Sequence, residues 1–323
     1  KARKFWGGGR VKYKGVYSGI RHGYQNGGSN ASYAIFMYFG AYSDGYDVDV
    51  YNKSLVRSNG PENSGRANFS DDCRLGTYAV FAGRREARLY NANLTISELN
   101  YSVSIRNGAG ACSLGTSCAI GFGSASNDEY NSTVDFYSEN LARTKGTGSD
   151  GRSSLGAAST TNHYIFAGGA TGGGGTHGGH NTFNAFDKNR VHTAGKIGAI
   201  RFSLRSGTVN GTAVFGGGQS YMSYQTTVWA IKDNLTVSTL TPLSYANSGY
   251  WAANAGNYLI FMPTDNENVN VDIYDKNLVK TVESKQFTSQ TISASASFDD
   301  LGIFVVRNES WATSAGSIAV YEV

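Results

Sequence analysis

One eight-residue pattern recurs along the whole chain and constrains its fold more than any other feature. Its clearest copy is VDIYDKNL, from Val271 to Leu278. Related copies are VDVYNKSL from Val48, ARLYNANL from Ala87, VDFYSENL from Val134, FNAFDKNR from Phe183 and VWAIKDNL from Val228, with a seventh, IAVY, from Ile318. Repetition of a short segment at such a spacing is typical of propellers and solenoids.

Each copy has the pattern of a strand that runs into a tight turn. Apolar and polar residues alternate up to an aromatic residue, which is the period of a half-buried strand. Asp and Asn follow, and their side chains favour turns because they hydrogen-bond the nearby backbone. We expect the Leu after the turn to begin the return strand.

A second repeated segment lies upstream of each copy, a short apolar strand that often ends in small residues. These segments start at residues 33, 78, 118, 163, 212, 258 and 301, so they step by 40 to 49 residues. That is the length of one four-stranded propeller blade. Runs of small residues precede them, such as GAAS from Gly156 and SASA from Ser293. Small residues suit innermost strands, which converge on a central channel.

The sequence therefore predicts an all-β fold, a single seven-bladed β-propeller over residues 1–323 with four-stranded antiparallel blades. The last repeat stops at Val323 without an outer strand, whereas the segment 5–19 precedes the first inner strand. We expect this N-terminal segment to complete the last blade and close the ring. Closure of this kind removes two exposed sheet edges.

Composition supports this architecture and narrows the classes of function. Charged residues make up only 16% of the chain, which has 42 Gly and 3 Pro, a profile of strands joined by tight turns. The formal net charge of +4 does not indicate a nucleic-acid-binding face, and no apolar run approaches the roughly 20 residues that cross a bilayer. We therefore expect neither nucleic acid as a partner nor insertion into a membrane.

The three cysteines fall in the inner part of two neighbouring blades. Cys73 and Cys112 lie at nearly the same point of successive inner strands, and Cys118 lies across a short hairpin from Cys112. One disulfide is geometrically allowed among them. The alternative is that all three are buried thiols that pack as small hydrophobic residues.

The repeated strands resemble those of kelch proteins, in particular the divergent kelch-like propellers of bacteria and their phages. The kelch pattern joins a Gly doublet to a later Tyr, and the doublet is present at Gly168-Gly169 and Gly216-Gly217. It is replaced at Met37-Tyr38, Met262-Pro263 and Val305-Val306, and the Trp that follows the Tyr in kelch repeats is absent. The resemblance spans essentially the whole chain and implies a propeller. It does not imply one function, since kelch propellers include both enzymes and binding scaffolds.

The loops between second and third strands vary in length and content, whereas the turns between third and fourth strands are uniform. Variation on one face of a regular scaffold is where recognition is normally built. Aromatic side chains beside amides and carboxylates suit a glycan or a protein epitope. The candidate ligand-binding residues in these loops are Tyr42, Asp44, Tyr46, Asn127, Asp128, Tyr130, Tyr221, Tyr224, Asn266 and Trp311.

Five arginines recur at the expected start of successive inner strands: Arg21, Arg66, Arg106, Arg152 and Arg201. Such a ring could aim guanidinium groups at the rim of the channel and bind a carboxylate or phosphate bidentately. The alternative is that each arginine ties its blade to the next through backbone carbonyls.

Signals for catalysis, metals or cofactors are weak. Two histidines in the Gly-rich loop, His177 and His180, have an H-x-x-H spacing, but a metal site needs a third ligand on a rigid frame. No nucleophile elbow or sialidase-type Asp box is present. Paired loop carboxylates such as Asp44 and Asp128 could perform glycosidase chemistry only at the right separation. We therefore expect no metal, no cofactor and no enzymatic activity.

These observations predict a recognition module, displayed outside the cell or on a phage tail, that binds a glycan or cell-surface protein through the variable face. One alternative is a structural component of a larger extracellular or virion assembly, with other subunits as partners. A second alternative is a glycan-active enzyme.

Overall fold

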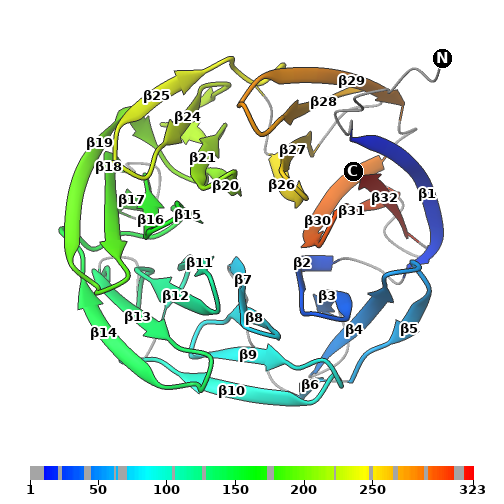
Figure 1. Ribbon diagram of the computed structural model, residues 1–323, viewed down its shortest axis with the longest axis horizontal. Helices are drawn as coiled ribbons and strands as arrows, with labels where there is room; N and C mark the ends of the chain where they lie inside the picture. Colours follow the sequence, from blue (N-terminus) through cyan, green and yellow to red (C-terminus); the bar gives the residue numbers. More distant parts are fainter. Residues whose placement is uncertain are drawn as a thin grey trace, which may run out of the picture.

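The regular secondary structure of the described residues consists of β-strands joined by turns and loops, without a helix. The computed structural model describes residues 11–20, 24–39, 45–61, 63–64, 71–103, 106–125, 129–172, 178–221, 223–246, 250–264, 268–286, 290–308 and 316–323. The strands form seven antiparallel sheets arranged around a central opening (Figure 1). The predicted seven-bladed propeller is confirmed. No helix in these residues is long and apolar enough to cross a membrane.

The first three blades run outward from the channel in sequence order. Blade 1 contains β2 (Tyr24–Ser29), β3 (Tyr33–Phe39), β4 (Gly45–Asn52) and β5 (Arg57–Asn59), with β6 (Asn63–Ser64) also paired to β4. Blade 2 contains β7 (Asp71–Leu75), β8 (Tyr78–Ala82), β9 (Glu86–Tyr90) and β10 (Ile96–Asn100). Blade 3 contains β11 (Gly110–Leu114), β12 (Ser117–Gly121), β13 (Thr133–Tyr137) and β14 (Arg143–Thr147).

The next three blades repeat the arrangement with small additions at the loop ends. Blade 4 contains β15 (Gly156–Ser159), β16 (His163–Ala167), β18 (Gly178–Asp187) and β19 (His192–Arg201), with β17 (Ala170–Thr171) paired to β18. Blade 5 contains β20 (Arg205–Val209), β21 (Thr212–Gly216), β24 (Val228–Ile231) and β25 (Val237–Leu240), and β22 (Gln219–Ser220) with β23 (Ser223–Tyr224) forms a separate hairpin. Blade 6 contains β26 (Tyr250–Ala255), β27 (Tyr258–Pro263), β28 (Asn268–Tyr274) and β29 (Lys280–Gln286).

Blade 7 joins the two ends of the chain. Its strands β30 (Gln290–Phe298), β31 (Leu301–Asn308) and β32 (Gly316–Glu322) come from the C-terminal end, and β1 (Lys12–Ile20) is its outer strand. β1 pairs antiparallel with β32, with Tyr17 opposite Ile318 (Figure 1). Closure of the ring by an N-terminal strand is thus confirmed. Residues 5–10 of the predicted closing segment lie outside the described residues.

The hydrophobic core is divided into seven clusters, one between each pair of neighbouring blades. The two aromatic residues of the repeat meet within a blade: Phe81 packs edge-to-face on Tyr90 and Phe261 on Tyr274, with ring centres 5.7 and 5.8 Å apart. Such pairs add about 0.5–1.5 kcal/mol beyond the burial of their area. This pairing gives a physical reason for the recurrence of Phe and Tyr at a fixed spacing.

The turn after each repeated Tyr is built by an Asx interaction and a left-handed residue. In blade 6, the Asp275 carboxylate accepts hydrogen bonds from the backbone N–H groups of Asn277 and Val279, at 2.8 and 2.9 Å. Leu278 has a φ of 63°, and its counterparts in blades 1 to 5 also have positive φ. The expectation that this Leu begins the return strand is therefore wrong. It closes the turn, and the strand begins two residues later, at Lys280.

In three blades, the second residue of the repeat is a buried Asp or Asn that hydrogen-bonds to the loop leading into the blade. Its side-chain oxygen accepts a hydrogen bond from the backbone N–H of a serine in that loop; the pairs are Asp135 with Ser102, Asn184 with Ser149 and Asp272 with Ser244, at 3.0, 2.9 and 2.7 Å. A buried carboxylate is stable only when it is bonded in this way.

All three cysteines are free and buried. Cys73 and Cys118 share the cluster between blades 2 and 3, whereas Cys112 lies in the next cluster, between blades 3 and 4. The thiols are therefore the buried hydrophobic groups of the second alternative, and no disulfide links them.

Candidate functional site

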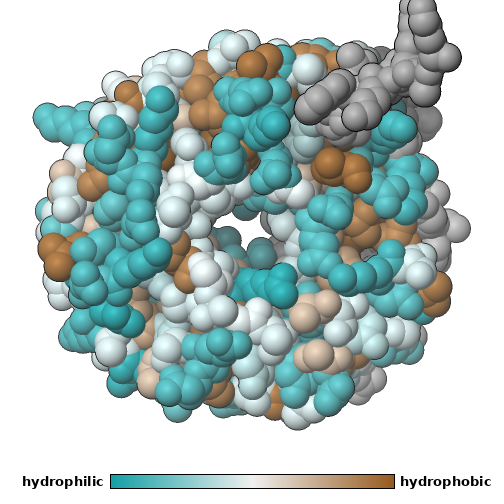
Figure 2. Space-filling model, viewed as in Figure 1, coloured by the Kyte–Doolittle hydropathy of each residue, from teal (hydrophilic) through white to brown (hydrophobic). Residues whose placement is uncertain are grey.

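The innermost strands of all seven blades surround a channel that contains a cavity of about 450 Å³. Figure 2 shows its opening at the centre of the disc, with hydrophilic residues at the edge. Small residues such as Ala111, Gly156, Ala157 and Ala252 line much of the wall. The predicted run of small residues at the channel thus leaves room for a ligand.

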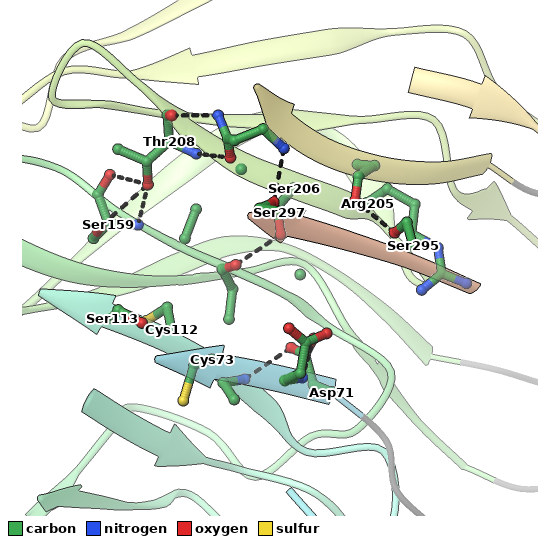
Figure 3. Close-up of a pocket in the computed structure, with 18 of the residues that line it drawn as sticks. Asp71, Cys73, Cys112, Ser113, Ser159, Arg205, Ser206, Thr208, Ser295 and Ser297 are labelled. Atoms are coloured by element: carbon green, nitrogen blue, oxygen red, sulfur yellow. Dashed lines mark hydrogen bonds between the residues drawn. The ribbon is translucent and has the colours of Figure 1, made fainter. Parts of the chain in front are cut away.

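Side-chain hydrogen bonds join neighbouring inner strands around the wall. Ser206 Oγ donates to the Ala157 carbonyl at 2.7 Å, Asn254 Nδ2 donates to the Thr208 carbonyl at 2.7 Å, and Ser295 Oγ donates to the Ala252 carbonyl at 2.7 Å. Figure 3 shows this polar wall from within the channel. The Ser, Thr and Asn side chains of the inner strands are therefore largely occupied with holding blades together.

Three larger side chains break the pattern of small residues at a single level of the channel. Asp71 of β7, Arg205 of β20 and Trp251 of β26 each pair, in their own blade, with the residue that follows the repeated Phe of the second strand. The same position in blades 3 and 4 is Gly110 and Gly156. Equivalent positions lie at the same level of the channel, and all three side chains line the cavity; Figure 3 shows Asp71 and Arg205 there.

This level is the mouth of the channel on the variable-loop face. Asp71 and Arg205 are the first residues of their inner strands, and Trp251 is the second residue of its strand. In an antiparallel blade the inner strand starts at the end where the second strand finishes. The loops between second and third strands therefore surround the mouth, and the uniform turns lie at the far end.

Asp71 is a carboxyl group held in place by the backbone. Its Oδ2 accepts a hydrogen bond from the Ala111 N–H at 2.8 Å, and its Oδ1 accepts one from the Asp72 N–H at 3.0 Å. Burial raises the pKa of Asp71 to about 7, although these bonds and the charge of Arg205 lower it. Near neutral pH, Asp71 is therefore divided between its protonated and ionised forms.

Asp72 projects from the other side of the same strand, toward blade 1, where Gly28 leaves space for it. Burial, and then the charge of Asp71, raise the pKa of Asp72 well above its usual value, while Arg205 lowers it. Both carboxyl groups of the pair therefore have raised pKa values, and the environment of each is different.

Arg205 comes from the opposite side of the ring. Its guanidinium stacks 4.1 Å from the centre of the Trp251 ring, and its Nε donates to the Tyr250 carbonyl at 2.6 Å. Burial lowers the pKa of Arg205, but the charges of Asp71 and Asp72 raise it. The mouth thus contains one fixed cation and two carboxyl groups that influence one another.

The predicted ring of arginines has a different role in the described residues. Arg106 donates to the carbonyls of Phe122 and Thr133 at 2.8 and 2.7 Å, and Arg152 donates to the Gly168 carbonyl at 3.0 Å. Arg201 donates to the Ile200 carbonyl at 2.7 Å. None of the three lines the channel cavity. The guanidinium groups of Arg106 and Arg152 thus hold strands of one blade together through backbone carbonyls, and Arg201 also donates to the side chains of Gln225 and Thr227. The carbonyl bonds of Arg106 and Arg152 do not tie one blade to the next, as the alternative had it, and none of the three arginines belongs to an anion ring at the channel. Arg21 and Arg66 lie outside the described residues.

Three of the ten candidate loop residues have a described side chain. Tyr221, at the tip of the β22–β23 hairpin, is 67% exposed, and Tyr224 and Tyr130 are partly buried. For Tyr46 the structure describes the backbone strand alone, in β4. Outside the described residues lie Tyr42, Asp44, Asn127, Asp128, Asn266 and Trp311.

No cluster suited to a metal ion is found among the described residues. No group of three or more His, Cys, Asp or Glu side chains converges there. His180 is described, and burial lowers its pKa, whereas His177 is not described.

The four residues at the channel mouth were not predicted from the sequence, although a signal was present. Aligned on the hairpin between the first and second strands, where Ile120 of blade 3 takes the place of the repeated Phe, the inner strands carry Gly110 and Gly156 in blades 3 and 4. Blades 2, 5 and 6 carry Asp71, Arg205 and Trp251 at the same position. Large or charged residues at a position of converging strands indicate a function other than packing. Asp72 carried the same signal, since the equivalent position in blades 3 to 6 holds a small residue: Ala111, Ala157, Ser206 and Ala252.

The solved structures that this chain resembles include two lyases. The selenomethionine-substituted virginiamycin B lyase of Staphylococcus aureus is 10% identical and superposes with a TM-score of 0.65 over 97% of this chain and 100% of that chain. A streptogramin B lyase structure is 9% identical, with a TM-score of 0.61 over 96% of this chain and 97% of that chain. At such identities the likeness shows the fold alone. The sequence matches no protein-family model and no curated protein.

These comparisons correct the expectation about enzymatic activity and do not test the expectation of a kelch-type repeat. We expected no enzymatic activity, and that expectation is overturned because the two propellers reported above are lyases, hence enzymes. The likeness names no reaction for this chain. The kelch type of repeat gains no support from these structures and stays a prediction.

Proposed function

We propose that this protein is an enzyme that transfers protons to and from a small polar substrate bound at the mouth of its channel. The observation that carries the proposal is the carboxyl pair, Asp71 and Asp72, at the edge of a cavity of about 450 Å³, a volume suited to a small molecule. Carboxyl groups whose pKa values are raised and separated are typical of acid–base catalysis.

The two carboxyl groups differ in the chemistry they support. Burial, and then the charge of Asp71, raise the pKa of Asp72 well above its usual value, so we assign it the role of general acid. Asp71, with a pKa of about 7, is ionised often enough to act as the general base. Its two backbone hydrogen bonds hold the carboxylate in one orientation, which favours proton transfer along a fixed direction.

The experiment is a screen that detects proton transfer on many candidate substrates in parallel. The purified protein is incubated in D₂O with a panel of small esters, lactones, amides and hydroxy acids, half of them anionic and half neutral. Mass spectrometry then detects deuterium uptake, elimination or hydrolysis. We expect turnover of at least one member, lowered roughly 10²–10⁴-fold by Asp71→Asn or Asp72→Asn, the usual contribution of a general acid or base.

Asp299→Asn provides the matched control. Asp299 lines the same cavity but pairs with Lys53 and Arg74, so this variant should keep full activity. Turnover that survives both Asp71→Asn and Asp72→Asn in folded protein would place the reaction elsewhere.

A second candidate function is recognition of a glycan or surface protein by the same face. It is favoured by Tyr221, which is 67% exposed at a hairpin tip where its left-handed φ of 52° costs free energy that packing does not offset. We expect binding on a glycan array that falls about tenfold or more in Tyr221→Ala with Tyr224→Ala. Val191→Ala, a change at an exposed residue of a turn on the opposite face, should leave binding unchanged. If the tyrosine variant and Val191→Ala bind the glycan array equally well, recognition through Tyr221 and Tyr224 is rejected.

A further inference from the structure

Arg205 presents two guanidinium nitrogens to the channel without a protein acceptor in the described residues. Its Nε is bonded to the Tyr250 carbonyl and its flat face rests on Trp251. No hydrogen bond or ion pair within the described chain engages Nη1 or Nη2, although Arg106, Arg152 and Arg201 all donate through these nitrogens. Arg205 lines the cavity (Figure 3). The two nitrogens Nη1 and Nη2, which we call the fork, are thus held in a fixed orientation at a space large enough for a ligand.

We propose that Arg205 is the subsite for a carboxylate group of the substrate, which it binds through Nη1 and Nη2. The proposal rests on the enzymatic function above and adds the substrate class, a small carboxylic acid. A planar guanidinium matches the two oxygens of a carboxylate. Stacking on Trp251 fixes the plane of the fork before the ligand arrives, so that little side-chain freedom is lost on binding.

The charges around the fork favour a single negative charge over a phosphate dianion. Asp71 and Asp72 lie close enough to influence Arg205, and they repel each added negative charge. Of the other charged groups that line the cavity, Arg74 and Asp299 form a pair, 3.9 Å apart. Arg205 is therefore the lining cation left to bind an anion, and one cation balances one carboxylate.

Protonation of Asp71 should control this binding. The groups that face the fork are Asp71 and Asp72 of β7, and the other titratable groups of the lining are the thiols Cys73 and Cys112 and the pair Arg74 and Asp299. A hydrogen bond with Cys118, and then burial, raise the pKa of Cys73, and burial raises that of Cys112, so both thiols stay neutral. Since Asp71 becomes negative as the pH rises through about 7, carboxylate affinity should be highest below that pH and fall above it.

The test compares benzoate with benzamide, which differ in charge but hardly in shape. Affinities are measured by isothermal titration calorimetry at about pH 6 and about pH 8, with inorganic phosphate as a third probe. We expect benzoate to bind roughly tenfold or more tightly than benzamide at the lower pH, with a smaller preference at the higher pH. Equal binding of benzoate and benzamide by the unaltered protein, or tighter binding of phosphate, would overturn the proposal.

Two variants locate the effect. Arg205→Gln should abolish the preference for benzoate, and Arg205→Lys should keep part of it because the charge remains while the fork is lost. Arg74→Gln, which removes a cation from the same cavity, should keep the full preference. A preference that persists in folded Arg205→Gln would also overturn the proposal.

The outcomes for this subsite and for the enzymatic function are separable. Benzoate binding that needs Arg205, with turnover indifferent to Asp71 and Asp72, supports the subsite and rejects the acid–base role. Turnover that needs Asp71, with no preference for anionic compounds, supports the acid–base role and rejects the subsite.

Discussion

Deletion of residues 1–20 is expected to abolish the folded monomer, because it removes the outer strand that closes the ring. β1 pairs with β32 at seven positions from Lys12 to Ile20. At about 0.5–1 kcal/mol net for each hydrogen bond, loss of this ladder costs roughly 4–7 kcal/mol. That is a large part of the stability of an ordinary domain. β32 would also become an exposed edge, able to pair with another chain.

Size-exclusion chromatography with light scattering, together with urea unfolding, measures this effect. The shortened protein should elute as aggregates or unfold at a much lower urea concentration. Deletion of residues 1–10 is the matched control, since it leaves β1 whole and should change neither property. If the protein without residues 1–20 is as stable as the wild type, the first six blades and the three remaining strands of blade 7 hold the ring together without closure by β1.

Local rules and repetition made the architecture predictable from the sequence. Seven copies of one strand-and-turn pattern define seven blades, and the missing outer strand after Val320 required a partner from elsewhere in the chain. The alternation of Val271 and Ile273 with Asp272 predicted a strand buried on one face, whereas the structure buries all of residues 271–274, because neighbouring blades pack on both faces of the sheet. These signals depend on a residue and its near neighbours, which a sequence displays directly.

Features set by contacts between distant residues were not predictable in the same way. Arg106 and Arg205 both stand near the start of inner strands, but Arg106 is buried against carbonyls and Arg205 faces the cavity. The difference depends on a shift of a few residues in strand register, which composition does not reveal. Asp71 and Arg205 are 134 positions apart in the sequence, and only closure of the ring brings them to one opening.

The left-handed Leu of the turns shows how burial can override local preference. A positive φ favours Gly or Asn, yet Leu278 has a φ of 63°. The structure keeps Leu278 in the turn because its side chain packs against the cluster between blades 5 and 6. The free energy of burying a Leu, about 1.5–3 kcal/mol when complete, is comparable to the strain of this conformation, about 1–3 kcal/mol.

Asp135→Asn is expected to lower the free energy of unfolding by about 3–5 kcal/mol, the usual effect of breaking a buried ion pair. Asp135 and Arg106 have fully buried side chains, and the Arg106 Nη2 is 2.7 Å from the Asp135 Oδ2. The substitution barely changes the shape of residue 135, so the loss comes from the charge of Arg106, left buried without a counter-ion. The Ser102 N–H, which also donates to Asp135 Oδ2, would lose a charged acceptor.

Urea unfolding measures this loss, and Glu98→Gln is the matched control because it removes a carboxylate from an ion pair at the surface. Glu98 pairs with Arg88 and has half of its side chain exposed, so its loss should cost about 1 kcal/mol or less. A double variant, Arg106→Met with Asp135→Leu, should be less destabilised than the sum of the single changes, since neither charge is then left unpaired. If Asp135→Asn costs no more than Glu98→Gln, water reaches Arg106 in solution, and the tie between the inner strand of blade 3 and its third strand is weaker than the geometry indicates.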